Sequence, residues 1–145
     1  MVSFKVVLND PKTKKSVQKE LSEEQSAALL GFKIGEKING DAIGFSGYEF
    51  VITGGSDTSG FPMRKDLEGT SRKKILSVRS TGLKQKRKGM LKRKNVRGNT
   101  ISEKIAQINM KIIKYGKQSL FADEEQTSGK SQDNQQEAKA EPAES

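Results

Sequence analysis

Short stretches of the chain alternate apolar and polar residues, and this period of two is typical of a β-strand with one buried side. The first stretch spans residues 2–8 and places four apolar side chains together: Val2, Phe4, Val6 and Leu8. The sequence around Pro11 is typical of a turn, because proline fixes φ and the neighbouring Asn and Asp favour turn conformations. Residues 17–21 then return, so the two stretches predict an antiparallel hairpin.

A single helix is predicted after this hairpin. Ser22 and Gln25 have the three-residue spacing of a capping box, and Glu23 and Glu24 suit the positive N-terminal end of a helix dipole. Gly31 can end the helix in the left-handed conformation. We therefore expect a short helix over about residues 23–30.

The remaining patterned stretches also predict strands. They are residues 48–53 (with Tyr48, Phe50 and Ile52), 73–80 (with Ile75, Leu76 and Val78) and 107–115 (with Ile108, Met110 and Ile112). Glycine recurs at positions 35, 40, 44 and 47, a spacing that suits tight turns between short strands. Many short strands with one helix favour a mainly β fold, and we predict a small antiparallel β-barrel.

The composition limits the chemistry that the chain can perform. Its 145 residues are enough for one domain, and a hydrophobic content of 32% can build one modest core. The absence of His and Cys excludes disulfides, zinc clusters, thiol nucleophiles and catalysis by imidazole. The chain has no apolar run long enough to span a membrane and no secretory signal pattern at its start. We expect a soluble, cytoplasmic protein with no metal and no cofactor.

Charge divides the chain into three parts. Residues 1–63 carry seven Lys and no Arg against eight acidic residues, residues 64–120 carry eighteen basic residues against three acidic ones, and residues 121–145 carry two against seven. The densest part, residues 84–97, has eight basic residues and no acidic residue. From Asp123 onward no aromatic or large aliphatic side chain is present, so we expect a disordered acidic tail.

The basic segment indicates a polyanionic partner. Neighbouring like charges repel each other within a screening length of about 8–10 Å, so the segment needs an anion to become ordered. A solvated surface normally mixes both signs of charge, and here the compensating acids are absent, which favours nucleic acid. An anionic membrane surface is the alternative, but residues 84–97 contain no aromatic residue and no lipid-anchor motif.

Residues 52–63 place three glycines in a short stretch, Ile-Thr-Gly-Gly-Ser-Asp-Thr-Ser-Gly-Phe-Pro-Met. Gly55 and Gly60 have the gap of a phosphate-binding P-loop, but Phe and Pro follow where that motif requires Lys and then Ser or Thr. The residues by themselves predict a tight turn in which glycines adopt positive φ, Asp57 bonds nearby backbone amides and Phe-Pro-Met folds back on the core.

The same stretch resembles the signature of the small-subunit ribosomal protein family that archaea and eukaryotes number six. That signature is an aliphatic residue followed by Gly-Gly-x-Asp-x-x-Gly-x-Pro-Met, and six positions match it: Gly54, Gly55, Asp57, Gly60, Pro62 and Met63. The basic run from Lys84 and the stretch 93–101 are similar to the family's second characteristic region. The resemblance covers roughly residues 2–120. The eukaryotic relatives carry a long basic C-terminal helix with phosphorylated serines, whereas this chain has a short acidic tail and is similar to the archaeal short form.

The resemblance implies a structural subunit of the small ribosomal particle that binds small-subunit rRNA beside neighbouring ribosomal proteins, without catalysis. Together with the charge pattern it predicts a set of rRNA-binding side chains: Arg64, Lys65, Arg72, Lys73, Lys74, Lys84, Lys86, Arg87, Lys88, Lys92, Arg93, Lys94 and Arg97. Because a planar guanidinium can hold two phosphate oxygens, four arginines are the first choices: Arg72, Arg87, Arg93 and Arg97. Gly89 and Gly98 are interpreted either as points where the backbone approaches RNA closely or turns, or as flexible joints.

The predicted organisation has four parts. Residues 1–83 form the β-barrel core, residues 84–100 a basic RNA-binding arm, residues 101–120 a returning segment that completes the fold, and residues 121–145 the tail. The arm is expected to have little regular structure without RNA, because residues 84–97 show no hydrophobic period.

Two other functions remain open. An enzyme would use carboxylates such as Asp41, Glu49, Asp57 and Asp66, but their spacing does not bring two of them to one site. A free-standing RNA-binding protein or RNA chaperone would share the basic arm. It would differ in being found outside the ribosome.

Overall fold

The fold is mainly β, as the alternating stretches predict, with one short α-helix. The computed structural model describes residues 3–78, 80–84, 87–116 and 120. The elements within these residues are β1 (Lys5–Asn9), β2 (Ser16–Glu20), α1 (Glu23–Ala28), β3 (Lys37–Asn39), the 3₁₀ helix η1 (Gly40–Ile43), β4 (Glu49–Asp57), β5 (Arg72–Ser77), β6 (Lys92–Arg97) and β7 (Ile105–Lys114).

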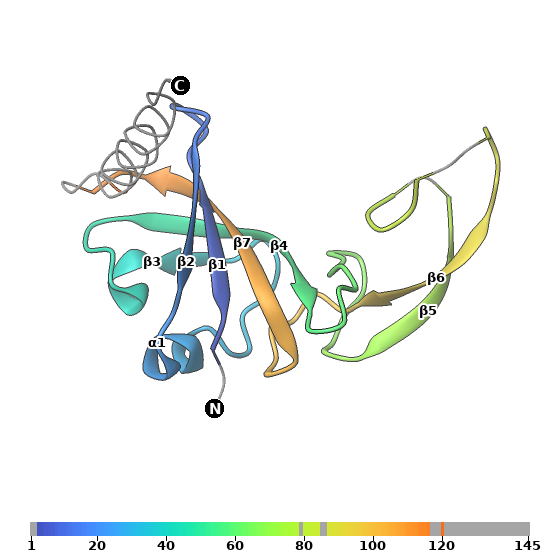
Figure 1. The fold of residues 1–145 in the computed structure, drawn as a ribbon, viewed down its shortest axis with the longest axis horizontal. Coiled ribbons are helices and arrows are strands. Elements are labelled where there is room, and N and C mark those ends of the chain that lie inside the picture. Colours follow the sequence, from blue (N-terminus) through green and yellow to red (C-terminus); the bar gives the residue numbers. More distant parts are fainter. Residues whose placement is uncertain (1–2, 79, 85–86, 117–119, 121–145) are drawn as a thin grey trace, which may run out of the picture.

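The strands form two sheets, and neither is closed into the barrel that we predicted. The larger is a five-stranded sheet in the order β2-β1-β7-β4-β3, and the smaller pairs β5 with β6 (Figure 1). The sheet is also mixed, because β1 and β7 run parallel while β1–β2, β3–β4 and β4–β7 are antiparallel. The predicted hairpin of the first two strands is confirmed, with Leu8 opposite Val17.

A helix and a turn cover the apolar side of this sheet in place of barrel closure. Leu29, which follows α1, and Ile43 at the end of η1 are buried in the same cluster as the inward side chains of β1, β4 and β7. The predicted helix is confirmed, although it is shorter at its end than expected. At its start, the Ser22 backbone amide donates a hydrogen bond to Gln25 Oε1 (3.3 Å), as in the predicted capping box.

The core includes the side chains that the period of two selected around the five-stranded sheet. They are Phe4, Val6, Leu8, Tyr48, Phe50, Ile52, Ile108, Met110 and Ile112. Leu76 and Val78 of the predicted strand 73–80 are instead exposed. Tyr48 stacks on Phe50 with ring centroids 5.8 Å apart. We call the five-stranded sheet with α1 and η1 the body of the molecule.

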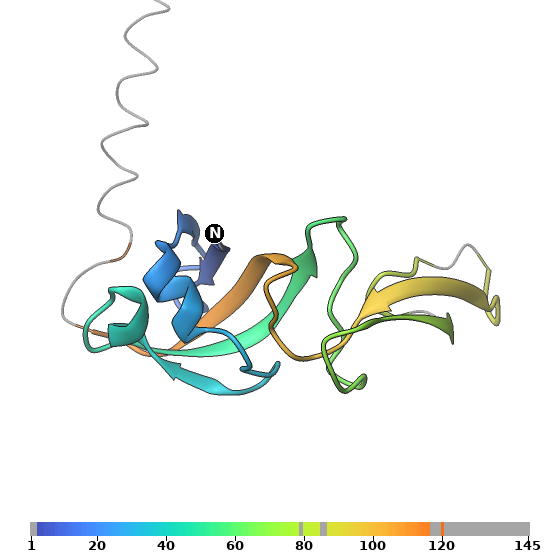
Figure 2. The ribbon, with the colours of Figure 1, turned by 90° about the horizontal axis from the view of Figure 1, so that it is seen from below.

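The β5–β6 hairpin projects from one end of the body (Figures 1 and 2). We call residues 72–97 the ribbon. The predicted strand over 73–80 is confirmed in its first part as β5, but residues 92–97 form β6 where we expected an arm without regular structure. Six antiparallel pairs, from Arg72–Arg97 to Ser77–Lys92, explain the difference. A neighbouring strand supplies backbone partners that the hydrophobic pattern of residues 84–97 does not reveal.

Two further expectations concern the ends of the chain and the membrane. The tail predicted over residues 121–145 lies outside the described residues. In the part of the chain that the structure describes, no helix is both long and apolar enough to cross a membrane.

Candidate nucleic-acid interface

The ribbon presents most of its cationic side chains to solvent. Nine of the predicted rRNA-binding residues are exposed and form no ion pair with any described residue: Lys65, Lys73, Lys74, Lys84, Arg87, Lys88, Lys92, Arg93 and Lys94. No Asp or Glu occurs between Glu68 and Glu103 in the sequence. These exposed side chains give the ribbon a surface of uncompensated positive charge, which is the surface that a polyanion requires. Lys86, another predicted contact, lies outside the described residues.

Two of the first-choice arginines are instead held at the base of the ribbon by Asp57. This carboxylate ends β4 and its side chain is 0% exposed. Arg72 Nε and Arg97 Nη1 donate to the same oxygen, Oδ2, at 2.6 Å and 2.7 Å. Arg72 and Arg97 are opposite each other in the first residue pair of β5 and β6. One carboxylate of the body therefore binds both strands of the ribbon. We call Asp57, Arg72 and Arg97 the ribbon anchor.

The remaining hydrogen bonds of the anchor extend into neighbouring loops. Thr58 Oγ1 donates to Asp57 Oδ1 (2.9 Å), Arg72 Nη2 donates to Ser59 Oγ (2.8 Å) and Arg97 Nη2 donates to Ser102 Oγ (2.9 Å). The Arg97 side chain is 5% exposed, and its Nε has no hydrogen-bond partner in the structure. Arg97 is therefore a structural residue of the hinge between body and ribbon rather than a side chain open to RNA.

The anchor strongly favours the ionised form of Asp57. The hydrogen bond from Arg72 is the largest cause that holds the pKa of this carboxyl well below its usual range. Burial acts in the opposite direction, and Thr58 and the positive charge of Arg97 lower the pKa further. Removal of the negative charge of Asp57 would leave the buried Arg97 guanidinium without an ionic partner, and an unpaired buried ion is costly.

A second contact fixes the segment that leads into the ribbon. Arg64 donates to both oxygens of Asp66, from Nε to Oδ1 at 2.8 Å and from Nη2 to Oδ2 at 2.6 Å. Its Nη1 also donates to Ser77 Oγ (3.2 Å) and Ser80 Oγ (2.9 Å), at the far end of β5. Arg64 was predicted to bind rRNA, and the structure places its guanidinium in this internal network.

The Gly-Gly-x-Asp signature positions the anchor. Its first part, up to Asp57, belongs to β4, and the predicted tight turn follows at Thr58 and Ser59. Gly54 and Gly55 lie within β4, and a Cβ on Gly55 would meet the carbonyl oxygen of Gln107 at 2.5 Å in the neighbouring strand β7. Only Gly60 has the predicted positive φ, at +78°, and its amide donates to the Asp57 carbonyl (2.7 Å). The Asp57 backbone carbonyl thus accepts from a nearby amide, whereas the bonds to its carboxylate come from side chains.

The end of the signature connects the body to β6. Met63 is buried and its amide donates to the Gly55 carbonyl (2.9 Å), so the chain folds back on the core as predicted. The amide of Arg97 donates to the Pro62 carbonyl (2.9 Å), and the amide of Arg64 donates to the Arg97 carbonyl (3.0 Å). Arg97 is therefore held twice. Its backbone bonds the segment around Pro62, and its side chain bonds Asp57.

The two glycines of the basic segment have different surroundings. Gly98 packs directly against the backbone of Gly69, where any side chain would collide with the Gly69 carbonyl group. It is a point of close approach within the protein, which neither of our interpretations anticipated. Gly89 has a φ of +79° and an open surrounding, as a turn residue requires.

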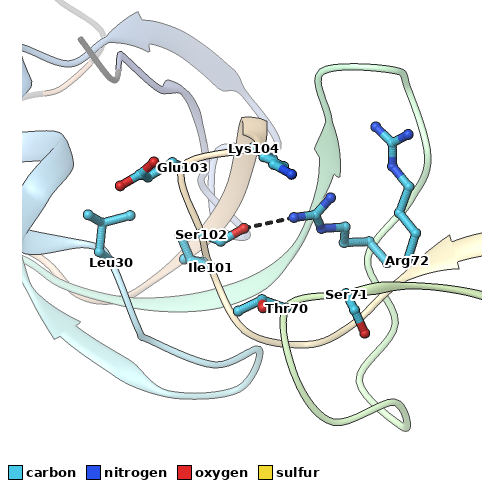
Figure 3. A pocket seen from close by; sticks show the side chains of 9 residues that line it. Leu30, Thr70, Ser71, Arg72, Ile101, Ser102, Glu103 and Lys104 are labelled. Carbon is cyan, nitrogen blue, oxygen red and sulfur yellow. Dashed lines mark hydrogen bonds between the residues drawn. The ribbon is translucent and has the colours of Figure 1, made fainter.

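A pocket of about 710 Å³ lies between the base of the ribbon and the loop that leads into β7 (Figure 3). Its wall contains Leu30, Thr70, Ser71, Arg72, Arg97, Ile101, Ser102, Glu103 and Lys104. Both arginines already bond Asp57, and Glu103 adds negative charge beside Lys104. The pocket is therefore a weaker candidate for binding an anion than the exposed ribbon.

Sequence reasoning named Asp57, Arg72 and Arg97 separately and did not predict that they bond one another. Asp57 is the only acidic residue between Glu49 and Asp66, and it follows a strand whose inward positions are apolar. A carboxylate at such a position needs a charged partner, and that rule points to an arginine. The spacing along the chain cannot identify which one, because Arg97 is forty residues away.

Comparisons with known proteins agree with the signature. The profile of the family described as ribosomal protein S6e matches residues 4–123. A protein of Methanosphaera stadtmanae named small ribosomal subunit protein eS6 is 45% identical over 126 residues, which cover 85% of this chain and 95% of the relative. A protein of the same name from Methanocaldococcus jannaschii is 46% identical, over 83% of this chain and 89% of the relative. The corresponding protein from Archaeoglobus fulgidus is 44% identical, over 80% of this chain and 91% of the relative. The chain therefore belongs to the ribosomal protein S6e family.

Proposed function

We propose that this protein is a structural, non-catalytic component of the small ribosomal subunit in the archaeal cytoplasm, and that it binds small-subunit rRNA through the ribbon. The observation that carries the proposal is the run of exposed cations on β5 and β6 without an acidic residue between Glu68 and Glu103. Membership of the S6e family supports the ribosomal role, because relatives carry the name small ribosomal subunit protein eS6.

The contact surface follows from which cations the fold leaves open. Arg64, Arg72 and Arg97 serve the fold, so the phosphate contacts fall to the exposed side chains of the ribbon, with Arg93 as the guanidinium of β6 that is free to hold two phosphate oxygens. The ribbon anchor gives these contacts a fixed direction relative to the body. An arm fixed at its base loses less entropy on binding than a fully disordered one.

The test removes charge from the ribbon and, as a matched control, from the body. One variant changes Lys73, Lys74, Lys92 and Lys94 to Gln, and the control changes the exposed Lys14, Lys33, Lys37 and Lys111 to Gln. Both lose four charges, so a purely nonspecific attraction would weaken equally in both. We expect the ribbon variant to bind a transcript of archaeal small-subunit rRNA at least tenfold more weakly than the control. Equal affinities of the two variants would contradict the proposal.

A second measurement separates a ribosomal subunit from a free-standing RNA chaperone. Sedimentation of a lysate should place the protein with the small subunit, and ribonuclease treatment should release it to low mass. A chaperone would sediment at low mass before the treatment as well. Membership of the ribosomal protein S6e family, whose profile matches residues 4–123, favours the first result.

A further inference from the structure

The two sides of the ribbon carry different side chains. Residues opposite each other in an antiparallel pair point to the same side, and the side alternates with each residue. The pairs Lys73–Val96, Ile75–Lys94 and Ser77–Lys92 therefore lie on one side, and the pairs Arg72–Arg97, Lys74–Asn95 and Leu76–Arg93 lie on the other. We call them the covered side and the open side.

The protein itself covers the apolar residues of the first side. Val96 is buried and packs near Gly82, which also lies against the ring of Pro62. Leu83 in the same turn is buried, and Ile75 is half-buried. The turn over residues 80–84 thus protects the covered side from solvent, as a hydrophobic surface requires.

The open side ends in aliphatic side chains that remain exposed. Leu76 is 60% exposed and pairs with Arg93. The same period carried one step beyond the strands places Val78 and Leu91 beside it, at 49% and 53% exposed. These three are most of the large hydrophobic residues that the described structure leaves open, which marks the tip of the ribbon as a binding surface.

We propose that the open side of the ribbon tip packs Leu76, Val78 and Leu91 against the nucleobases of the bound RNA, while cations on both sides hold the phosphates. This inference rests on the proposed function and names the part of the RNA that the tip contacts. The unstacked bases of RNA loops and bulges expose apolar faces beside phosphates. Leu and other aliphatic side chains act as wedges against bases in other nucleic-acid complexes.

Charge selects RNA over a protein as the occupant of this surface. Arg93 lies directly opposite Leu76, and Lys74 lies two residues before Leu76 on the same side of the ribbon. The apolar cluster is therefore bordered by positive charge. No acidic side chain of the ribbon is available for a basic or neutral protein partner to pair with. Bases with adjacent phosphates match both features of the surface at once, the apolar centre and the cationic border.

The experiment compares an apolar variant with a charge variant of the same size. Leu76→Ser with Leu91→Ser removes two aliphatic side chains from the open side, and Lys92→Gln with Lys94→Gln removes two charges from the covered side. Each is titrated with a transcript of archaeal small-subunit rRNA at several salt concentrations. Leu91→Ser alone is included because Leu91 lies outside β6, so it tests the surface without altering a strand.

The two variants should weaken binding in different ways. We expect the leucine variant to lose about 10- to 100-fold in affinity with an unchanged dependence on salt, because apolar contacts release no counterions. The lysine variant should lose affinity and show a flatter salt dependence, by about 0.7–0.9 in the slope for each phosphate contact. The melting temperature of all variants should match that of the parent, because the altered side chains are exposed.

Other outcomes overturn one proposal or both. If the leucine variants bind as tightly as the parent while the lysine variant is weakened, the base contact is wrong and rRNA binding by the ribbon stands. If, in addition, the leucine variants enter the small subunit poorly, the open side binds a ribosomal protein. If no variant changes the affinity, the ribbon is not the rRNA-binding surface, and the proposed function fails with the inference.

Discussion

The body and the ribbon are built from the same kind of strand but place their charges and apolar residues in opposite ways. In the body, most large apolar side chains are buried, and acidic residues lie among the lysines, as in the Lys5–Glu20 and Lys114–Glu49 ion pairs. In the ribbon, leucines at the tip are exposed and the lysines of β5 and β6 have no ion-pair partner among the described residues. The body therefore contains both signs of charge, whereas the ribbon contains basic residues and no acidic residue.

The ribbon anchor lies at the boundary between these regions. Asp57 belongs to the body, and Arg72 and Arg97 belong to the two strands of the ribbon. The basic residues of the ribbon therefore differ in their surroundings. Those at the base fix the direction of the ribbon, and those toward its tip remain available for phosphates. Four predictions test this division, beginning with the largest expected effect.

The largest effect should be the salt dependence of rRNA binding. If the exposed cations of the ribbon neutralise about 6–10 phosphates, affinity should fall by about 10³- to 10⁵-fold between 50 and 200 mM salt, because counterions are released on binding. A filter-binding titration measures this slope. A slope near zero would show that the cations of the ribbon do not bind phosphates, which would contradict the difference drawn between ribbon and body.

Removal of the anchor carboxylate should give the next largest effect. Asp57→Asn leaves the buried Arg97 guanidinium without its ionic partner, so we expect a loss of about 3–5 kcal/mol in the free energy of unfolding. The control Asp66→Asn removes the charge of a carboxylate that is 59% exposed and should cost less than about 1 kcal/mol. Urea titration measures both, and similar losses in the two variants would mean that the anchor does not hold the ribbon.

Acid should weaken the anchor in a defined pH range, with a smaller effect than the substitution itself. The pKa of Asp57 is lower in the folded protein than the ordinary value of about 3.9, so its contribution to stability is complete above that value. It is lost as the pH falls below 3.9 toward the folded pKa. The stability difference between the parent and Asp57→Asn should therefore narrow between pH 6 and pH 3. Asp10 and Asp66, whose pKa values are also lowered, are present in both proteins. A constant difference would contradict the ionic role of Asp57.

The smallest effect should follow deletion of residues 123–145. This segment has no large aliphatic or aromatic side chain and carries the same sign of charge as RNA. The melting temperature and the entry of the protein into the small subunit should both be unchanged. A truncated chain that failed to enter the subunit would assign the tail a role that neither the body nor the ribbon explains.

The sequence predicts the body better than the ribbon, for physical reasons. The strand with Phe50 and Ile52, the strand with Ile108 and Met110 and the helix after Ser22 follow from local patterns, because each buries one side on a core. The parallel pairing of β1 with β7 joins segments about a hundred residues apart, and no local pattern determines it. The open sheet could not be separated from a barrel for the same reason.

The sequence did not predict β6, because most of its residues are charged. Lys92, Arg93 and Lys94 are polar on both sides of β6, so the period of two disappears even though the backbone is extended and paired. The buried state of Arg97 was hidden as well. Nothing in its immediate neighbours distinguishes it from Arg93, which is exposed, since the difference lies in Asp57 from a distant strand.

A density map of the small ribosomal subunit with this protein in place tests the central claim most directly. The account predicts that the body rests on the surface of the particle and that the ribbon enters the rRNA, with the amino groups of Lys73, Lys92 and Lys94 within hydrogen-bond distance of phosphate oxygens. Arg97 should remain bonded to Asp57 and make no contact with RNA. A map in which the ribbon lies in solvent or against another protein, with the body lysines on the phosphates, would contradict it.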